Sequence, residues 1–140
     1  MATRAPPLYT PEILNAATGL ANFPWDEALL LRGEARSRSC GSAIAMALSI
    51  DAAAQIVQIG IKPHACAVGQ AAAHIFASGA GGLTREAVTA SRLSLAAWLA
   101  GEGPPPAWPG IELIAPARAY PARHGAILLA WDAALAALGD

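Results

Sequence analysis

Apolar and small residues alternate most regularly between residues 43 and 50. The apolar positions are Ile44, Met46, Leu48 and Ile50. Successive side chains of a β-strand point to opposite faces, so this pattern predicts a strand with one buried face. A turn at 51–54 leads to a further β-rich segment, whose apolar positions are Ile56, Val57, Ile59 and Ile61. We expect Pro63 to end that strand, because proline cannot donate a backbone hydrogen bond.

A weaker alternation precedes these two segments. Between residues 35 and 39, Arg36 and Arg38 alternate with small side chains, which predicts a strand with a polar face. Residues 25–33 are ambiguous, because the apolar run at 28–31 suits either an edge strand or a turn of helix. The connections between the three predicted strands are short, and short connections favour antiparallel pairing.

Apolar residues recur at helical spacing in the other segments. We predict helices over residues 9–20, 66–78, 84–100 and 127–138. Thr10 and Thr84 suit the N-cap positions of two of them, and Pro11 suits a first helical position. Gly-rich residues 79–82 end the second helix, and the Gly/Pro-rich stretch 101–109 is a surface connection. The chain therefore predicts an α+β fold, in which a three-stranded antiparallel sheet carries helices on one face.

Composition limits the classes of function. A chain of 140 residues is long enough for one domain with a single core. A net charge of -1, with 14% charged residues, argues against a surface for nucleic acid or an anionic membrane. The N-terminal residues lack the apolar run of a secretory segment, and the uncharged stretch 65–83 contains too many polar residues and glycines for a membrane span. We expect a cytoplasmic protein with free thiols.

Two cysteines are the strongest candidates for chemistry. Cys40 stands in a predicted turn, and Cys66 lies at the start of the second predicted helix. Backbone N–H groups and the helix dipole stabilise a thiolate at such positions. Thiolates bind soft metal ions and attack sulfur. A buried, unreactive role is the alternative for both residues, because free cysteine is among the most buried residue types.

Short motifs follow one another in a specific order around these cysteines. They are Cys40-Gly41, Ala65-Cys66-Ala67, Gly82-Leu83-Thr84-Arg85-Glu86-Ala87, and Pro121-Ala122-Arg123 running into Leu129-Ala130-Trp131. With this order the chain resembles the iron–sulfur cluster scaffold family of the IscU/NifU N-terminal type, and is most similar in pattern to its SufU-like branch. The resemblance covers residues 9–138. It implies a three-stranded antiparallel sheet with helices on one side, in one scaffold-like domain over residues 1–140.

The resemblance also implies a binding site. Members of this family hold an iron–sulfur cluster or zinc with three cysteines, and an aspartate follows the first Cys-Gly. Cys40 and Cys66 match the first two cysteines, whereas Ser42 occupies the aspartate position and Ala126 the position of the third cysteine. A [2Fe–2S] cluster and a structural zinc ion each take four ligands. Two thiolates from one chain therefore leave the ligand set incomplete.

Histidines are the candidates for further ligands. His124 lies two positions before Ala126 and is the best substitute, so we predict a metal site that includes Cys40, Cys66 and His124. His64 lies two positions before Cys66 and could turn toward the same point. His74 shares a helical stripe with Cys66 but lies about 12 Å further along, at ~1.5 Å per residue, which is too far for a shared metal ion.

Two more residues are expected around the bound group, together with His64. Ser42 is expected to stabilise the turn with its hydroxyl, because a serine alkoxide is a poor ligand at neutral pH. Arg123 is a candidate cation beside a thiolate or a cluster, and a plain surface charge is the alternative reading.

The leading interpretation is an iron–sulfur cluster assembly scaffold or carrier that is not an enzyme and holds a cluster, such as [2Fe–2S], or zinc. The resemblance implies a cysteine desulfurase and recipient apo-proteins as partners, and a homodimer would let two chains supply four thiolates. One alternative is a metal-free member of the family that acts as an interaction or regulatory module of the assembly machinery. Another is a sulfur acceptor from a cysteine desulfurase. A thiol hydrolase ranks last, because no oxyanion site or orienting acid is apparent in the sequence.

Overall fold

The computed structural model describes residues 7–38 and 41–139. The strands form one antiparallel sheet in the order β1-β2-β3. They are β1 (Leu31–Arg36), β2 (Ala43–Ile50) and β3 (Ile56–His64). The α-helices are α1 (Pro11–Thr18), α2 (Ala67–Gly79), α3 (Arg85–Leu99) and α4 (His124–Leu138), and the short 3-10 helices are η1 (Gly19–Asn22), η2 (Ile111–Ala119) and η3 (Pro121–Arg123). The predicted α+β fold with a three-stranded antiparallel sheet is confirmed.

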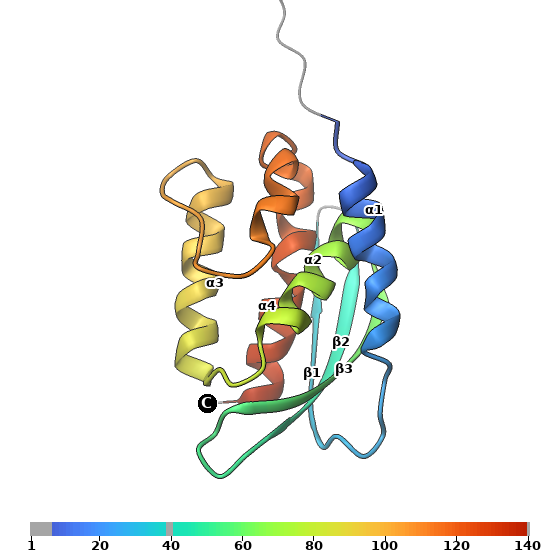
Figure 1. Cartoon of the computed structure of the whole chain (residues 1–140), viewed down its shortest axis with the longest axis vertical. Helices are drawn as coiled ribbons and strands as arrows, with labels where there is room; N and C mark the ends of the chain where they lie inside the picture. The colour runs from blue at the N-terminus through green and yellow to red at the C-terminus, as the bar shows by residue number, and fades with distance from the viewer. Residues whose placement is uncertain (1–6, 39–40, 140) are drawn as a thin grey trace, which may run out of the picture.

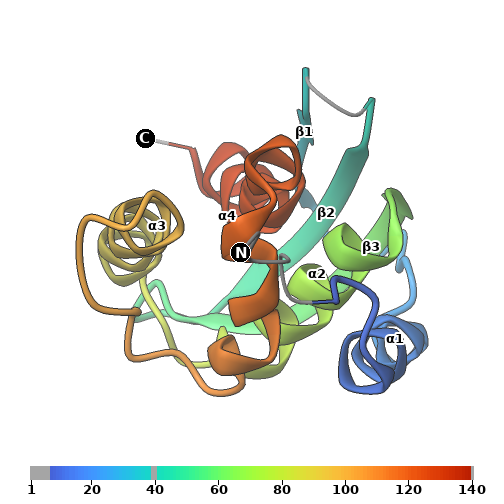
Figure 2. The same cartoon turned by 90° about the horizontal axis from the view of Figure 1, so that it is seen from above.

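The helices pack in layers on one side of the sheet. Helices α2 and α4 lie against the sheet and against each other, while α1 packs outside α2 and α3 outside α4 (Figure 1). Seen from above, the sheet curves around the inner pair of helices (Figure 2). Among the described residues, no helix combines the length and the apolar character that crossing a lipid bilayer requires.

The inward face of the central strand forms the middle of the core. Ile44, Met46 and Leu48 are completely buried there, as their alternation predicts. Ala47 points to the other face and is also completely buried. The loop 23–30 crosses that outer face, since a Cβ on Gly60, the β3 partner of Ala47, would lie 2.8 Å from the carbonyl oxygen of Pro24. This loop explains why residues 25–33 carry apolar side chains without a regular period.

An aromatic cluster fills the space between the helices on the other side. The ring of Trp131 on α4 packs edge-on against Phe76, with centroids 5.1 Å apart, and Trp108 stacks on Phe76 at 5.3 Å. The indole N–H of Trp108 donates to the carbonyl oxygen of Ile75 at 2.8 Å, and that of Trp131 donates to the hydroxyl of Ser91 at 3.1 Å. Each buried indole thus has a hydrogen-bond acceptor, as burial of a polar group requires.

Threonine side chains cap the N-termini of two helices. The Thr10 hydroxyl accepts a hydrogen bond from the backbone N–H of Ile13 at 3.1 Å, and Pro11 occupies the first turn of α1. The Thr84 hydroxyl accepts from the N–H of Ala87 at 3.3 Å at the start of α3. Both predicted caps are confirmed. Helix α4 begins at His124, three residues earlier than expected, and the 3-10 helices η2 and η3 before it were not predicted.

Two sequence-based expectations about the strands are wrong. The first strand spans Leu31–Arg36, not residues 35–39, because its inward positions include Gly33, which the alternation of apolar side chains does not mark. Of the expected segment, Ser39 lies outside the described residues. Strand β3 also continues through Pro63 to His64, and Pro63 pairs with Ile44. Since β3 is an edge strand, a proline whose missing N–H faces away from β2 costs no ladder hydrogen bond.

Strand β1 touches the backbone of α4 at Gly33. A Cβ at this position would overlap the backbone nitrogen of Ala137 and the carbonyl oxygen of Ala133. The alanines of α4 and this glycine therefore bring a helix and a strand closer together than larger side chains would permit. The close approach is possible because alanine adds little bulk at a contact.

We expect Gly33→Ala to lower the free energy of unfolding by roughly 2–3 kcal/mol, the cost of overpacking a rigid contact. The atoms that the new methyl group meets belong to the helix backbone and have little room to move. Urea denaturation followed by circular dichroism measures the change. Gly81→Ala is the matched control, because nothing lies within 4 Å of its Cβ position. Equal midpoints for the two variants would contradict the close contact.

Candidate functional site

The register of the sheet brings two loops together at one end of the molecule. Ala43 at the start of β2 pairs with His64 at the end of β3. The turn before β2 and the link from β3 to α2 therefore lie side by side. Figure 1 shows the start of β2 toward the same end of the molecule as the first turns of α2 and α4. Segments separated by more than eighty residues thus meet at this end.

A polar cavity of about 360 Å³ opens where these segments meet, and we call it the thiol cavity. It is lined by Gly41, Ser42, Pro63, His64, Ala65, Cys66, Gln70 and Arg123. Among the described lining residues no side chain is acidic, whereas Arg123 is cationic. The electrostatic environment of the cavity therefore favours an anion such as a thiolate or a thiolate-bound cluster.

Cys66 stands at the N-cap of α2. Its backbone is extended, with φ −65° and ψ 168°, and its carbonyl oxygen accepts the N–H of Gln70 at 2.9 Å. The side chain is half-buried and the thiol is free. The first N–H groups of a helix lack partners within the helix, and Cys66 stands beside them without a side-chain capping hydrogen bond. The predicted placement of Cys66 at a helix start is confirmed.

The other predicted cysteine, Cys40, lies outside the described residues, but the two residues after it line the thiol cavity. Gly41 has φ +71°, a left-handed conformation that favours glycine. Ser42 is 4% exposed, and its carbonyl oxygen accepts the N–H of Ser37 at 2.8 Å, which closes the turn. The structure thus places the chain immediately after Cys40 at the wall of the cavity that contains Cys66.

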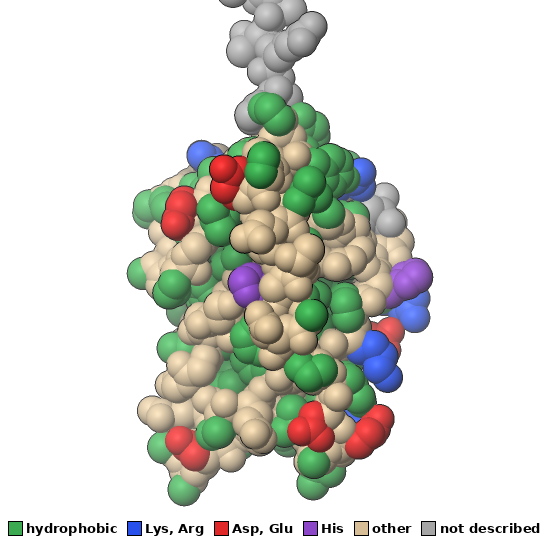
Figure 3. Space-filling view, turned by 45° about the vertical axis from the view of Figure 1, so that its right-hand side comes forward, with side chains coloured by type: hydrophobic (Ala, Val, Ile, Leu, Met, Phe, Trp, Pro, Cys, Tyr) green, Lys and Arg blue, Asp and Glu red, His purple; other side chains and the backbone are tan. Residues whose placement is uncertain are grey.

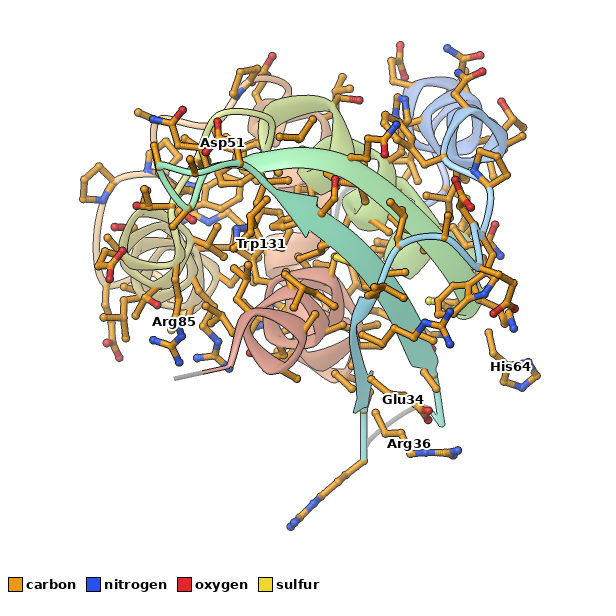
Figure 4. All side chains as sticks on the ribbon, turned by 90° about the horizontal axis from the view of Figure 1, so that it is seen from below. Glu34, Arg36, Asp51, His64, Arg85 and Trp131 are labelled. Atoms are coloured by element: carbon orange, nitrogen blue, oxygen red, sulfur yellow. The ribbon has the colours of Figure 1, made fainter. Side chains whose placement is uncertain are left out.

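The two remaining predicted residues of the cavity differ in their exposure. His64 is exposed at the end of β3, and Figure 4 shows it at the same end of the sheet as Glu34 and Arg36, with its ring directed outward. Arg123 is half-buried at the end of η3. Arg123 is therefore the residue that brings positive charge into the cavity, whereas His64 forms part of its rim.

His124 occupies the first position of α4 but is not part of the cavity lining. Its Nε2 lies 3.1 Å from the carbonyl oxygen of Ala117 and 3.2 Å from that of Arg118. A carbonyl oxygen only accepts, so Nε2 carries the proton and Nδ1 holds the lone pair in the neutral ring. Nδ1 is thus the atom of His124 that could ligate a metal ion.

A metal ion requires several donor atoms close together. Within residues 7–38 and 41–139, no three side chains of His, Cys, Asp or Glu are grouped in a way that could hold a metal ion, and that range leaves out Cys40. The predicted ligand set of Cys40, Cys66 and His124 stays a prediction for this reason.

Ala126, which stands at the position of the third cysteine, lies close to the first turn of α2. It is completely buried. A Cβ on Gly69 would lie 3.5 Å from the Cβ of Ala126, and Gly69 follows Cys66 by three residues on the same helical face. The first turns of α2 and α4 therefore cross at close range beside the thiol cavity.

Comparisons with known proteins agree with this fold. No protein-family model and no curated protein sequence matches the chain. Its fold matches the crystal structure of a nitrogen-fixing NifU-like protein (N-terminal) from Brucella abortus with a TM-score of 0.80 and 27% sequence identity, over 91% of this chain and 90% of that one. The chain has the IscU/NifU-type fold.

A second structure supports the fold of this IscU/NifU-type chain. It is FiSufU from the thermophile Fervidobacterium islandicum AW-1, named as an iron–sulfur cluster assembly scaffold protein for the SUF system. The TM-score is 0.77 at 21% identity, over 94% of this chain and 97% of that one. At this identity the likeness concerns the fold.

Gln70 is a residue of the cavity that sequence reasoning missed. Its side-chain Nε2 donates to the carbonyl oxygen of Ala65 at 2.9 Å. This bond ties the residue before Cys66 to the second turn of α2. Its spacing could have indicated a place beside Cys66, because Gln70 follows Cys66 by four residues and so lies on the same face of the helix. The donor–acceptor pair itself depends on the path of residues 63–66, which local spacing does not reveal.

We expect Gln70→Leu, made in a Cys40→Ser chain, to raise the rate of alkylation of Cys66 by iodoacetamide about fivefold. Loss of one hydrogen bond, worth about 1 kcal/mol, lets the segment that carries the half-buried thiol open more often. The rate is measured by mass spectrometry of the labelled protein. Gln58→Leu, on the exposed face of β3, is the control. Equal rates in both variants would show that the Gln70 bond does not hold Cys66 in place.

Proposed function

We propose that this protein is an iron–sulfur cluster scaffold or carrier, whose cargo is held in the thiol cavity by the thiolates of Cys40 and Cys66. The observation that carries the proposal is the position of Gly41 and Ser42, the residues directly after Cys40, in the lining that also contains Cys66 and Arg123. Thiolates are the usual ligands of iron–sulfur clusters, and the cationic Arg123 favours the negative charge that such a cluster carries. The names of the structural neighbours support the same function.

Two chains can complete the ligand set. A [2Fe–2S] cluster takes four ligands, and two cysteines from each of two chains supply four thiolates. The exposed rim formed by Gly41 and His64 leaves the cavity open to a second copy. Within one chain, His124 through Nδ1 is the alternative donor, and zinc is the alternative metal. We therefore propose a cluster shared by a homodimer as the first model to test.

The supply of sulfur follows from the chemistry of the thiols. A cysteine desulfurase carries a persulfide, whose terminal sulfur the Cys66 thiolate can attack. Cys66 then becomes a persulfide and the desulfurase cysteine leaves as a thiolate, so that no external oxidant or reductant is consumed. Recipient apo-proteins then take the finished cluster from this protein. In this proposal the protein is a cytoplasmic carrier and not an enzyme.

Anaerobic reconstitution with ferrous iron and sulfide tests the scaffold directly. We expect a visible absorption band and one cluster per two chains, both lost in Cys40→Ser and Cys66→Ser, because each cluster needs all four thiolates. Iron and sulfide analysis with size-exclusion chromatography gives the stoichiometry. A Ser94→Cys change in the doubly substituted chain is the control, since it adds an exposed thiol on α3. A colourless wild-type protein, unaffected by the cysteine changes, would overturn the scaffold proposal.

A third thiol at position 126 should stabilise the bound cluster. In Ala126→Cys the new sulfur arises beside the first turn of α2, where it can replace a ligand from the second chain. We expect cluster loss to a chelator, followed by visible absorption, to slow severalfold, because each chain then offers a third thiolate. Ala130→Cys, one turn later on α4 and equally buried, is the matched control. If both variants lose the cluster as fast as the wild type, position 126 does not face the cargo.

A further inference from the structure

A second cavity, of about 610 Å³, lies between α1, α2 and η2 and shares no lining residue with the thiol cavity. We call it the α1 groove. One wall is formed by α1 and η1, the floor by His74, Ile75 and Ser78 of α2, and the far wall by Pro109, Gly110 and Leu113. Its volume is in the range of ligand-binding pockets. The side of the molecule with α1 and α2 faces forward in Figure 3, where uncharged surface dominates and charged side chains lie toward the margins.

Both asparagines of the chain line this groove. Asn15 on α1 and Asn22 at the end of η1 stand on the same wall and are exposed. Within the described part of the chain, neither carboxamide has a hydrogen-bond partner, whereas the backbone carbonyl of Asn15 accepts bonds from the Thr18 hydroxyl and the Gly19 N–H. A carboxamide offers a donor and an acceptor side by side, which match the N–H and C=O of one peptide residue.

The spacing of the two asparagines fits an extended peptide. Asn22 follows Asn15 by seven residues, partly in α-helix and partly in 3-10 helix, which corresponds to a rise of about 12 Å. Four residues of extended chain span about 13 Å, and residues separated by an even number direct their backbone groups to the same side. Each carboxamide can thus bind one residue of the same extended segment, four positions apart.

The floor of the groove is suited to apolar side chains. The ring of His74 packs directly on the backbone of Gly19, the first residue of η1, since a Cβ there would lie 2.6 Å from its Nε2. That nitrogen also lies 3.3 Å from the hydroxyl of Ser78. Ile75 and Leu113 add apolar surface beside the ring. A side chain that points down from the centre of the segment would contact this surface.

Glu12 is the one charged residue among those that line the groove. It precedes Asn15 by about one helical turn, so it lies beyond one end of the segment that the asparagines can hold. We propose that the α1 groove binds an extended segment of a partner protein, through backbone hydrogen bonds to Asn15 and Asn22, with a lysine or arginine of that segment paired with Glu12. This binding is independent of the thiol cavity and of its cargo.

Selection from a phage-displayed library of random heptapeptides tests the proposal on the full chain. We expect the wild type to enrich peptides with a lysine or arginine at one end and apolar residues at alternate positions. An Asn15→Ala/Asn22→Ala variant should not enrich them, and Glu12→Gln should remove the preference for the basic residue. Because all three positions are exposed, these variants are expected to fold, which circular dichroism verifies. Gln58→Ala, on the exposed face of β3, is the control and should select the same peptides as the wild type.

An enriched peptide is then synthesised and titrated into labelled protein. We expect the side-chain NH₂ resonances of Asn15 and Asn22 to shift, and affinity to fall roughly tenfold when both are alanine, as loss of two or more hydrogen bonds implies. The proposal is overturned if wild type and double variant enrich the same peptides, or if nothing is enriched. It is equally overturned if the asparagine signals do not move, or if free arginine amide binds as tightly as the peptide.

Discussion

The close packing of α4 against the sheet and against α2 is the constraint on which the rest of the structure depends. At Gly33 the strand meets the helix backbone, and at Gly69 the first turn of α2 meets Ala126 of α4. Neither contact leaves space for a longer side chain. Since α4 begins directly after Arg123, the same packing fixes the distance of that residue from the start of α2. A site assembled from three remote segments is thus held by contacts between small residues.

This constraint also shapes the chemistry of the site. Small residues bring helix ends close to strand ends, and helix ends offer N–H groups without partners. Cys66 stands at such an end, beside a left-handed turn at Gly41 and the guanidinium of Arg123. These groups all favour negative charge. The cavity is accordingly suited to thiolate sulfur and to the clusters that thiolates hold, although Ala126 offers no donor.

The molecule has two concave surfaces with different chemistry. The thiol cavity is polar, has no acidic lining residue among those described and lies where chain segments end. The α1 groove runs between elements, has Ile75 between two polar residues in its floor and carries one carboxylate at its side. We propose that the thiol cavity holds cargo and the α1 groove holds a partner. Their separation means that a partner can remain bound while the cargo enters or leaves.

The sequence by itself determined the features that depend on near neighbours. The alternation at residues 43–50, the threonine caps and the position of Cys66 before a helix are local, because strand pleat and helix capping involve residues within a few positions of one another. Only the tertiary structure decided the place of β1 and the passage of β3 through Pro63, which depend on α4 and on the edge position of the strand. It also decided that Gly41, Cys66 and Arg123 line one cavity. That meeting rests on strand register and helix crossing, which join residues far apart in the chain and leave no local pattern.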